Sequence, residues 1–210
     1  PASTRLRVAL VGAGYVATHH LAALKQLDFV DVVGICDPQL PAAQALADRF
    51  GVKRVAARLD DLADLQPQAV YVLTPPAFHA AIALQAMEMG CHVLVEKPMA
   101  DTVADCESMI AAARTRKLQL GVNHSDLFDP VVMQALQAVR DGRIGDVVSV
   151  EIVRNSEYPP YAGGPLPGSV TQGSYPFRDL GVHGLYTIEA FLGPVRDLRV
   201  DYQARGTDPK

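Results

Sequence analysis

Short apolar runs alternate with amphipathic helical patterns through residue 122. The runs, which often end at glycine or before proline, predict buried strands at residues 6–11, 31–36, 53–56, 69–73, 92–96 and 118–122. Segments with helical periodicity lie between them, at residues 15–27, 41–50, 77–89 and 102–117. Strict alternation of this kind predicts an α/β fold, a doubly wound parallel sheet of the Rossmann type with helices on both faces.

The pattern changes after Asn123, so we expect one domain at residues 1–123 and a second, α+β domain at residues 124–210. Helices are predicted at 130–140 and 179–192. Residues 146–154 alternate apolar and polar side chains, which predicts a strand with one solvated face, and 195–204 could form one more. Residues 155–177, rich in Pro, Gly, Ser and Tyr, form a predicted long loop bordering the substrate pocket. The candidate substrate contacts in this loop are Tyr158, Tyr161 and Tyr175, and the competing interpretation is a mobile surface loop.

Composition narrows the classes of function. The chain has 210 residues, 49% of them hydrophobic, and a formal net charge of −4 without a basic run. Nucleic acid and anionic membrane surfaces are therefore not expected partners, and no apolar run is long enough to span a bilayer. The six histidines lack zinc-ligand spacing, so no metal site is expected. Three scattered cysteines favour a reducing, cytoplasmic location.

The segment after the first predicted strand carries the motif G-x-G-x-x-A, at Gly12, Gly14 and Ala17. The first glycine allows a sharp turn, the second lets the backbone approach a pyrophosphate, and the alanine lets the helix pack closely on the strand. Tyr15 and Val16 open that helix, whose first N–H groups would face the phosphates. The motif predicts a dinucleotide site.

The second predicted strand ends at Asp37, at the offset expected of the residue that binds the ribose. Its carboxylate could accept hydrogen bonds from both ribose hydroxyls and would repel a 2′-phosphate, so NAD is expected in preference to NADP. The competing interpretation is that Asp37 caps the next helix.

Three motifs together resemble the glucose–fructose oxidoreductase and inositol dehydrogenase family, Gfo/Idh/MocA, across residues 6–193. They are the glycine turn, a T-P-x-x-x-H helix followed by E-K-P at Glu96, Lys97 and Pro98, and a D-x-G-x-H helix at Asp179, Gly181 and His183. The resemblance implies a C-terminal domain with an open, mostly antiparallel sheet, through which members commonly dimerise, so a homo-oligomer is expected. It also implies a cis peptide bond between Lys97 and Pro98.

Roles for individual residues follow from the same resemblance. Thr74, Pro75 and His79 would lie along the cofactor. Glu96 would sit near the nicotinamide and Lys97 would contact the reacting oxygen, while Asp179 and His183 would face the substrate. The other histidines named by position, His19, His20, His92 and His124, are interpreted as structural or surface residues.

These residue types suit the oxidation of a secondary alcohol, which needs a hydride acceptor, a base and a positive group near the developing alkoxide. Histidine titrates near neutrality, so His183 could take the proton. Asp179 precedes it by four residues, on the same helix face, and Lys97 supplies the charge. The predicted function is an NAD(H)-dependent oxidoreductase acting on a small molecule: a sugar, a polyol or a related cyclic alcohol.

Two departures from the family pattern leave alternatives open. The stretch NHSDLFDP has Ser125 and Asp126 around the position where many relatives carry an arginine. The chain also stops soon after the D-x-G-x-H helix, where relatives continue through more strands, so the second domain is expected to be incomplete. The alternatives are a catalytically silent dinucleotide-binding regulator or scaffold, and a fragment that works only with a partner chain.

Overall fold

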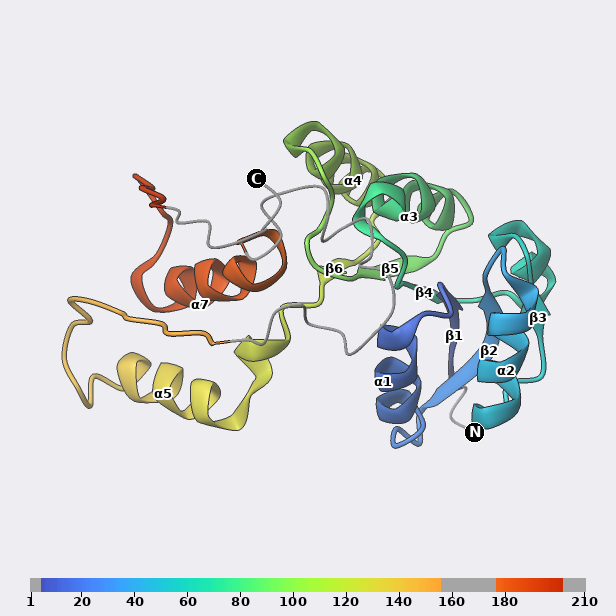
Figure 1. The fold of residues 1–210 in the computed structure, drawn as a ribbon, viewed down its shortest axis with the longest axis horizontal. Coiled ribbons are helices and arrows are strands. Elements are labelled where there is room, and N and C mark those ends of the chain that lie inside the picture. The colour runs from blue at the N-terminus through green and yellow to red at the C-terminus, as the bar shows by residue number, and fades with distance from the viewer. Residues whose placement is uncertain (1–4, 156–176, 202–210) are drawn as a thin grey trace, which may run out of the picture. The chain divides into compact units, whose positions relative to one another are not determined.

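A computed structural model describes residues 5–155 and 177–201 of the chain (Figure 1). The chain divides into two compact units, Pro1–Asn123 and His124–Lys210, each with its own contacts. The candidate loop tyrosines Tyr158, Tyr161 and Tyr175 lie outside the described residues.

The first unit is built on a six-stranded sheet in the order β3-β2-β1-β4-β5-β6, with every neighbouring pair parallel. Its strands are β1 (Leu6–Val11), β2 (Val30–Cys36), β3 (Val55–Ala56), β4 (Ala69–Val72), β5 (His92–Val95) and β6 (Leu120–Val122). The strand order reverses between β1 and β4, which is the switch point where doubly wound folds bind their ligands. The Rossmann-type parallel sheet predicted from the apolar runs is confirmed.

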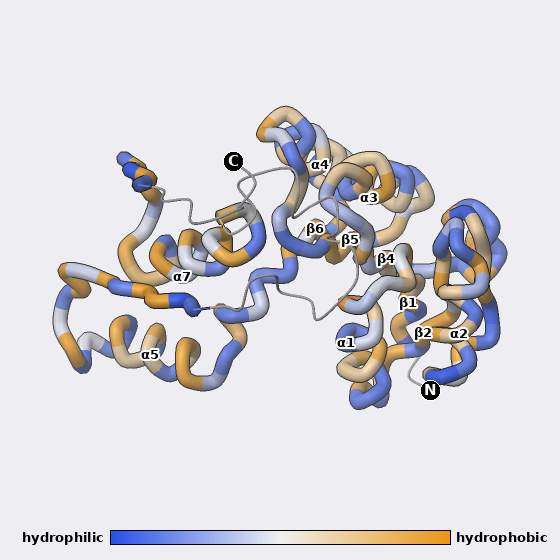
Figure 2. The backbone as a smooth tube through the Cα atoms, in the orientation of Figure 1, coloured by the Kyte–Doolittle hydropathy of each residue, from blue (hydrophilic) through white to orange (hydrophobic). Residues whose placement is uncertain are grey.

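Helices cover both faces of this sheet. On one face lie α1 (Tyr15–Leu24) and α2 (Leu40–Phe50), and on the other lie α3 (His79–Glu88) and α4 (Val103–Arg116) (Figure 1). The side chains of β1 alternate between the two cores: Val8 and Leu10 pack with α1 and α2, while Ala9 and Val11 pack toward α3 and α4. The strands are therefore hydrophobic along most of their length, as Figure 2 shows, because both faces are buried.

Local sequence explains several of the element ends. Helix α4 begins after Thr102, whose hydroxyl accepts a hydrogen bond from the Asp105 N–H, and α2 ends at Gly51, in the left-handed conformation. Helix α1 ends at Leu24, earlier than predicted, and a 3₁₀ helix at Leu59–Leu65 was not predicted. A second short 3₁₀ turn, Pro76–Phe78, precedes α3.

The second unit contains a 3₁₀ turn at Ser125–Phe128, helix α5 (Pro130–Arg140), a π-helical turn at Phe177–Gly181 and helix α7 (Val182–Leu192). Asp129 caps α5 by accepting the N–H groups of Val131 and Val132. The predicted single helix at 179–192 is thus a π-helical turn followed by an α-helix. Helix α7 contacts both α5 and the Ser125–Phe128 turn.

The predicted strand at 146–154 is wrong, since residues 146–154 form no strand, and none forms within 195–201. The open antiparallel sheet expected for the second domain is therefore not present among the described residues. Alternation of polar and apolar residues indicates which face a strand would bury, but a strand also needs a neighbour for its backbone hydrogen bonds. Val148 and Val153 are 92% and 72% exposed as a result.

Within the described ranges, no helix combines the length and the apolar character needed to cross a bilayer.

Candidate functional site

The carboxyl ends of the strands bring most of the candidate residues of the first unit to one edge of the sheet. Gly12 follows β1, Asp37 follows β2, Thr74 comes just after β4, Glu96 follows β5 and Asn123 follows β6. Because all six strands are parallel, these five positions share the edge at which the switch point opens.

Gly12 can only be glycine in this turn. Its φ of +104° is one that other residues rarely adopt, and a Cβ atom here would lie 2.6 Å from the carbonyl oxygen of Leu73. Its N–H donates to the carbonyl of Cys36, 2.8 Å away, so the turn is tied to the end of β2. The first glycine of the motif therefore permits the close passage of two strand ends.

Gly14, unlike Gly12, has open space where a side chain would be. It is the N-cap residue of α1, with no capping side chain, and a Cβ atom there would meet nothing within 4 Å. Ala17, one turn into the helix, is fully buried against the sheet. The geometry leaves open space in front of the helix N-terminus, where a diphosphate would approach the backbone, and so fits a dinucleotide.

Tyr15 and Val16 form the start of α1. The Tyr15 side chain is 79% exposed and its ring meets the His19 ring edge-on, with 4.7 Å between centroids. The N–H groups of a first helical turn have no partners within their own helix, so these two residues offer donors and the positive end of the helix dipole to an anion.

The carboxylate of Asp37 is built into the glycine turn. Oδ2 accepts the N–H of Ala13 and Oδ1 accepts the N–H of Gln39, each at 2.8 Å. The N-cap of α2 is Gln39, so Asp37 is not the capping residue of that helix. A carboxylate has about four acceptor sites, so the two that remain can still receive ribose hydroxyls.

Thr74 and Pro75 follow the end of β4, and their side chains differ in burial. The Thr74 hydroxyl is buried without a hydrogen-bond partner among the described residues, and Pro75 is exposed. A buried hydroxyl without a partner is uncommon and suits a site completed by a ligand.

His79 does not present a ring nitrogen to the open edge of the sheet. Its side chain is fully buried, with Nε2 2.7 Å from the carbonyl oxygen of Thr74 and Nδ1 3.0 Å from that of Pro98. The expected place of His79 along the cofactor stays a prediction, in which the ring nitrogens would not be the contacting atoms. The ring instead fastens the end of β4 to the turn that carries Lys97.

Glu96 is buried, 7% exposed, and three donors converge on its carboxylate. Oε1 lies 2.8 Å from Nε2 of His20 and 2.6 Å from Nδ2 of Asn123, and Oε2 accepts the Lys97 N–H at 3.1 Å. Burial pushes the pKa of Glu96 upward, but the hydrogen bonds from His20 and Asn123 and the charge of His20 outweigh it, so the pKa is lowered. Glu96 is thus an ionised anchor.

Lys97 follows this anchor directly. Its side chain is half-buried, and its peptide bond to Pro98 is cis, as predicted. Glu96 holds the Lys97 N–H while His79 holds the Pro98 carbonyl, so hydrogen bonds fix the backbone on both sides of the cationic residue.

His20 and Asn123 are site residues that sequence reasoning missed. His20 was interpreted as structural or surface, and it is a largely buried partner of Glu96, with its ring edge against Tyr71. The three residues of this network are separated by 76 and 27 positions along the chain. No local pattern joins such distant positions, although a glutamate at the end of a buried strand signals that donors must converge on it.

In the second unit, His183 lies in a cluster around the Ser125–Phe128 turn. Its Nδ1 is 2.5 Å from the Tyr186 hydroxyl and 3.3 Å from Oδ1 of Asp126. Asp126 also forms an ion pair with Arg154. Asp179 is half-buried in the π-helical turn that precedes His183. Asp126 and Tyr186 were not singled out as site residues from the sequence.

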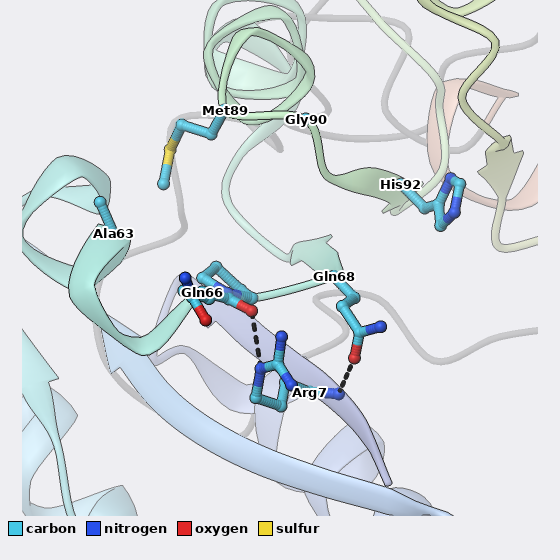
Figure 3. A pocket seen from close by; sticks show the side chains of 8 residues that line it. Arg7, Ala63, Gln66, Gln68, Met89, Gly90 and His92 are labelled. Atoms are coloured by element: carbon cyan, nitrogen blue, oxygen red, sulfur yellow. Dashed lines mark hydrogen bonds between the residues drawn. The ribbon is translucent and has the colours of Figure 1, made fainter. Parts of the chain in front are cut away.

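An open depression lies at the other end of the parallel sheet (Figure 3). The Arg7 Nε donates to the carbonyl of Gln66 at 2.8 Å, and the Arg7 N–H donates to Oε1 of Gln68 at 3.1 Å. The lining residues come from the amino-terminal ends of β1, β4 and β5 and from the helices that precede β4 and β5: Arg7, Ala63, Gln66, Pro67, Gln68, Met89, Gly90 and His92. Doubly wound folds bind ligands at the carboxyl ends, so this depression is not the dinucleotide site.

Known proteins share this architecture. D-glucoside 3-dehydrogenase of Escherichia coli (strain K12) is 33% identical over 198 residues, which is 91% of this chain and 55% of that protein. The solved structure of GenD2 from gentamicin A biosynthesis, in complex with NAD, is 29% identical with a TM-score of 0.75, over 90% of this chain and 54% of that one. A 3-ketoreductase from Actinomadura kijaniata, in complex with TDP-benzene and NADP, is 30% identical with a TM-score of 0.62, over 68% of this chain and 44% of that one.

The chain spans about half the length of the curated relatives it matches. Residues 6–124 match the oxidoreductase family with an NAD-binding Rossmann fold, and residues 132–209 match the GFO/IDH/MocA C-terminal domain. The chain therefore belongs to the Gfo/Idh/MocA oxidoreductase family.

Proposed function

We propose that this chain is an NAD(H)-dependent oxidoreductase that transfers a hydride between nicotinamide and a secondary alcohol of a sugar, a polyol or a cyclic derivative. The observation that carries the proposal is the placement of Lys97. It follows β5 at the sheet edge that also bears Gly12 and Asp37, and its backbone is held by Glu96 on one side and His79 on the other.

The dinucleotide would be held by residues of the first unit alone. Gly14, Tyr15 and Val16 would take the diphosphate, and Asp37 would take the adenosine ribose through the acceptor sites that Ala13 and Gln39 leave free. The negative charge of Asp37 disfavours a 2′-phosphate, so the proposal includes a preference for NAD. Some relatives use NADP, such as the Actinomadura kijaniata 3-ketoreductase, which makes this preference a property to measure.

The protein side chains would manage the proton and the charge on oxygen. Bound NAD⁺ supplies the hydride acceptor. When the bound nicotinamide accepts the hydride from the carbinol carbon, the His183 imidazole would accept the alcohol O–H proton, which leaves a ketone. Lys97 stabilises the negative charge that develops on the oxygen, an effect worth about 10²–10³ in rate when such a group is preorganised. Asp179 would hold a neighbouring substrate hydroxyl or the imidazole ring.

Relatives support the substrate class, because they include enzymes named for glucosides and for inositol. The geometry gives a reason why Glu96 is not the base: its carboxylate is buried, ionised and already accepts three hydrogen bonds. Resemblance to the family and the near-neutral titration of histidine support His183 as the proton acceptor in this proposal.

The test is a turnover assay on the purified chain with sugars, polyols and cyclic alcohols, following reduced nicotinamide with NAD and with NADP. Lys97→Met and His183→Gln should each lower kcat by about 10²–10⁴ while NAD affinity stays nearly unchanged. Lys53→Met and His92→Gln, at exposed positions, are the matched controls and should keep full activity.

Two outcomes would overturn the proposal. Tight NAD binding with no turnover on any substrate indicates the catalytically silent regulator or scaffold. Near-wild-type turnover in both Lys97→Met and His183→Gln places the chemistry elsewhere.

A further inference from the structure

Two oxygen atoms approach the same ring nitrogen of His183. The Tyr186 hydroxyl is 2.5 Å from Nδ1 and Oδ1 of Asp126 is 3.3 Å from it. Asp126 and Tyr186 also contact each other, because the backbone N–H of Asp126 donates to the Tyr186 hydroxyl oxygen at 3.2 Å. Asp126 and Tyr186 thus form one unit around Nδ1.

The surroundings hold Tyr186 in this place. Its side chain is 6% exposed, and its ring stacks on His124 with 4.1 Å between centroids and an interplanar angle of 16°. On the other side it meets the His183 ring nearly edge-on, at 5.4 Å. Ring contacts on both sides leave the hydroxyl little freedom to turn away from Nδ1.

The chemistry of these oxygens decides where the ring proton sits. An ionised carboxylate can only accept hydrogen bonds, and Asp126 is paired with Arg154, which favours the ionised form. A hydrogen on Nδ1 can be donated to the Asp126 carboxylate and to the Tyr186 oxygen, whose other lone pair accepts the Asp126 N–H. In the opposite tautomer the Tyr186 O–H could donate to Nδ1, but the Nδ1 lone pair would then face the lone pairs of the Asp126 carboxylate, which is repulsive, so Asp126 decides in favour of Nδ1–H.

We propose that Asp126 and Tyr186 are positioning residues for His183, which keep the ring proton on Nδ1 and so make Nε2 the nitrogen that exchanges a proton with the substrate oxygen. The inference rests on the proposed function in giving His183 the role of base. After the transfer both nitrogens carry hydrogen, and Asp126 then lies beside the positive ring.

The segments packed near His183 carry several charged and titratable groups. The pKa of His124 is lowered, mainly by burial, against the opposing effect of Glu189. The groups contributed by the surrounding elements are Asp126, His124, Arg154, Asp179, Tyr186 and Glu189.

Nuclear magnetic resonance of the ¹⁵N-labelled full chain tests this without a substrate, because ring ¹⁵N shifts report which histidine nitrogen carries hydrogen. The His183 signals are assigned by their loss in His183→Gln. Above the pH at which the ring titrates, the wild type should show a protonated Nδ1 and an unprotonated Nε2. Asp126→Asn and Tyr186→Phe should each move the ring toward a mixture of tautomers.

The control is Asp129→Asn, which makes the same charge change three residues away and keeps the cap of α5. It should leave the His183 tautomer unchanged, and Asp126→Glu should largely restore it. The signals of the other five of the six histidines show whether each variant is folded. A wild-type ring protonated on Nε2, or a tautomer unchanged in both folded variants, overturns the inference.

Kinetics separates this inference from the proposed function. With an active substrate, Asp126→Asn and Tyr186→Phe should lower kcat by about 10–100-fold, the size of effect seen when metal-binding histidines lose an orienting partner, with little change in KM and a displaced pH profile. Absence of any wild-type turnover contradicts the proposed function and leaves the tautomer result standing. Normal turnover with the wrong tautomer contradicts only the positioning role.

Discussion

Nε2 of His20 lies 2.8 Å from Oε1 of Glu96, which joins the helix after the glycine turn to the strand end before Lys97. Asn123 donates to the same oxygen from the end of β6. A single buried carboxylate thus connects three elements at the edge of the sheet where we place the cofactor.

Replacing Glu96 should destabilise the first unit in a pH-dependent way. Glu96→Gln keeps the shape of the side chain, but its uncharged amide has one acceptor oxygen and an NH₂ group that faces hydrogen-bond donors. The free energy of unfolding should therefore fall by about 2 kcal/mol near neutral pH. The folded pKa of Glu96 lies below the ordinary 4.5, so its stabilisation is fully present above 4.5 and is lost as pH falls through the folded value. The difference between wild type and variant should therefore shrink in acid.

Urea unfolding of both proteins across this pH range measures the difference. Glu88→Gln, at an exposed position on α3, is the control and should cost almost nothing at any pH. A gap between wild type and Glu96→Gln that widens toward acid pH would refute the assignment of Glu96 as an ionised anchor.

Alanine should have different effects at the two motif glycines: mainly a loss of stability at position 12 and mainly a loss of NAD affinity at position 14. Gly12→Ala should cost about 2–5 kcal/mol of stability, from the positive φ and the overlap with the Leu73 carbonyl together. Gly14→Ala should cost less, about 0.5–1 kcal/mol, because nothing lies within 4 Å of the added methyl group. That methyl group occupies the approach to the diphosphate, so NAD affinity should fall by about tenfold or more, or about 1.4 kcal/mol.

Thermal unfolding and calorimetric titration with NAD separate the two effects. Equal losses of stability in both variants, or unaltered NAD affinity in Gly14→Ala, would be incompatible with the geometry of the turn.

His79 should prove to be a structural fastener. His79→Phe fills similar space but removes the ring N–H that donates to one of the two carbonyls it faces, those of Thr74 and Pro98, at a cost of about 1–3 kcal/mol. His92→Phe is the control, since that ring is exposed and accepts one hydrogen bond, from the Gln119 N–H. If His79→Phe were as stable as wild type and had lost NAD affinity, the residue would be a cofactor ligand after all.

The sheet of the first unit could be predicted because both of its faces are buried. Its strands appear in the sequence as short apolar runs, and a Gly, Pro or Asp marks several of their ends. The glycine turn was predictable for the same reason, since only glycine tolerates the backbone at position 12.

The failures share a physical cause, because each depends on a partner distant in sequence. Residues 146–154 alternate like a strand, but no described strand supplies the hydrogen-bonding neighbour. The pairing of His20 with Glu96 spans 76 positions, and the pairing of His183 with Asp126 joins two separate segments. Residue types gave the chemistry of these side chains, and packing decided which of them meet.

The central claim is that the carboxyl edge of the sheet binds NAD through the glycine turn and Asp37. Calorimetric titration of the full chain with NAD and with NADP measures this directly, alongside Asp37→Asn and the control Asp31→Asn at the exposed start of β2. We expect NAD to bind about tenfold or more tighter than NADP, a difference of about 1.4 kcal/mol that Asp37→Asn reduces and Asp31→Asn retains. Equal or tighter binding of NADP, or binding of neither dinucleotide, would contradict the claim.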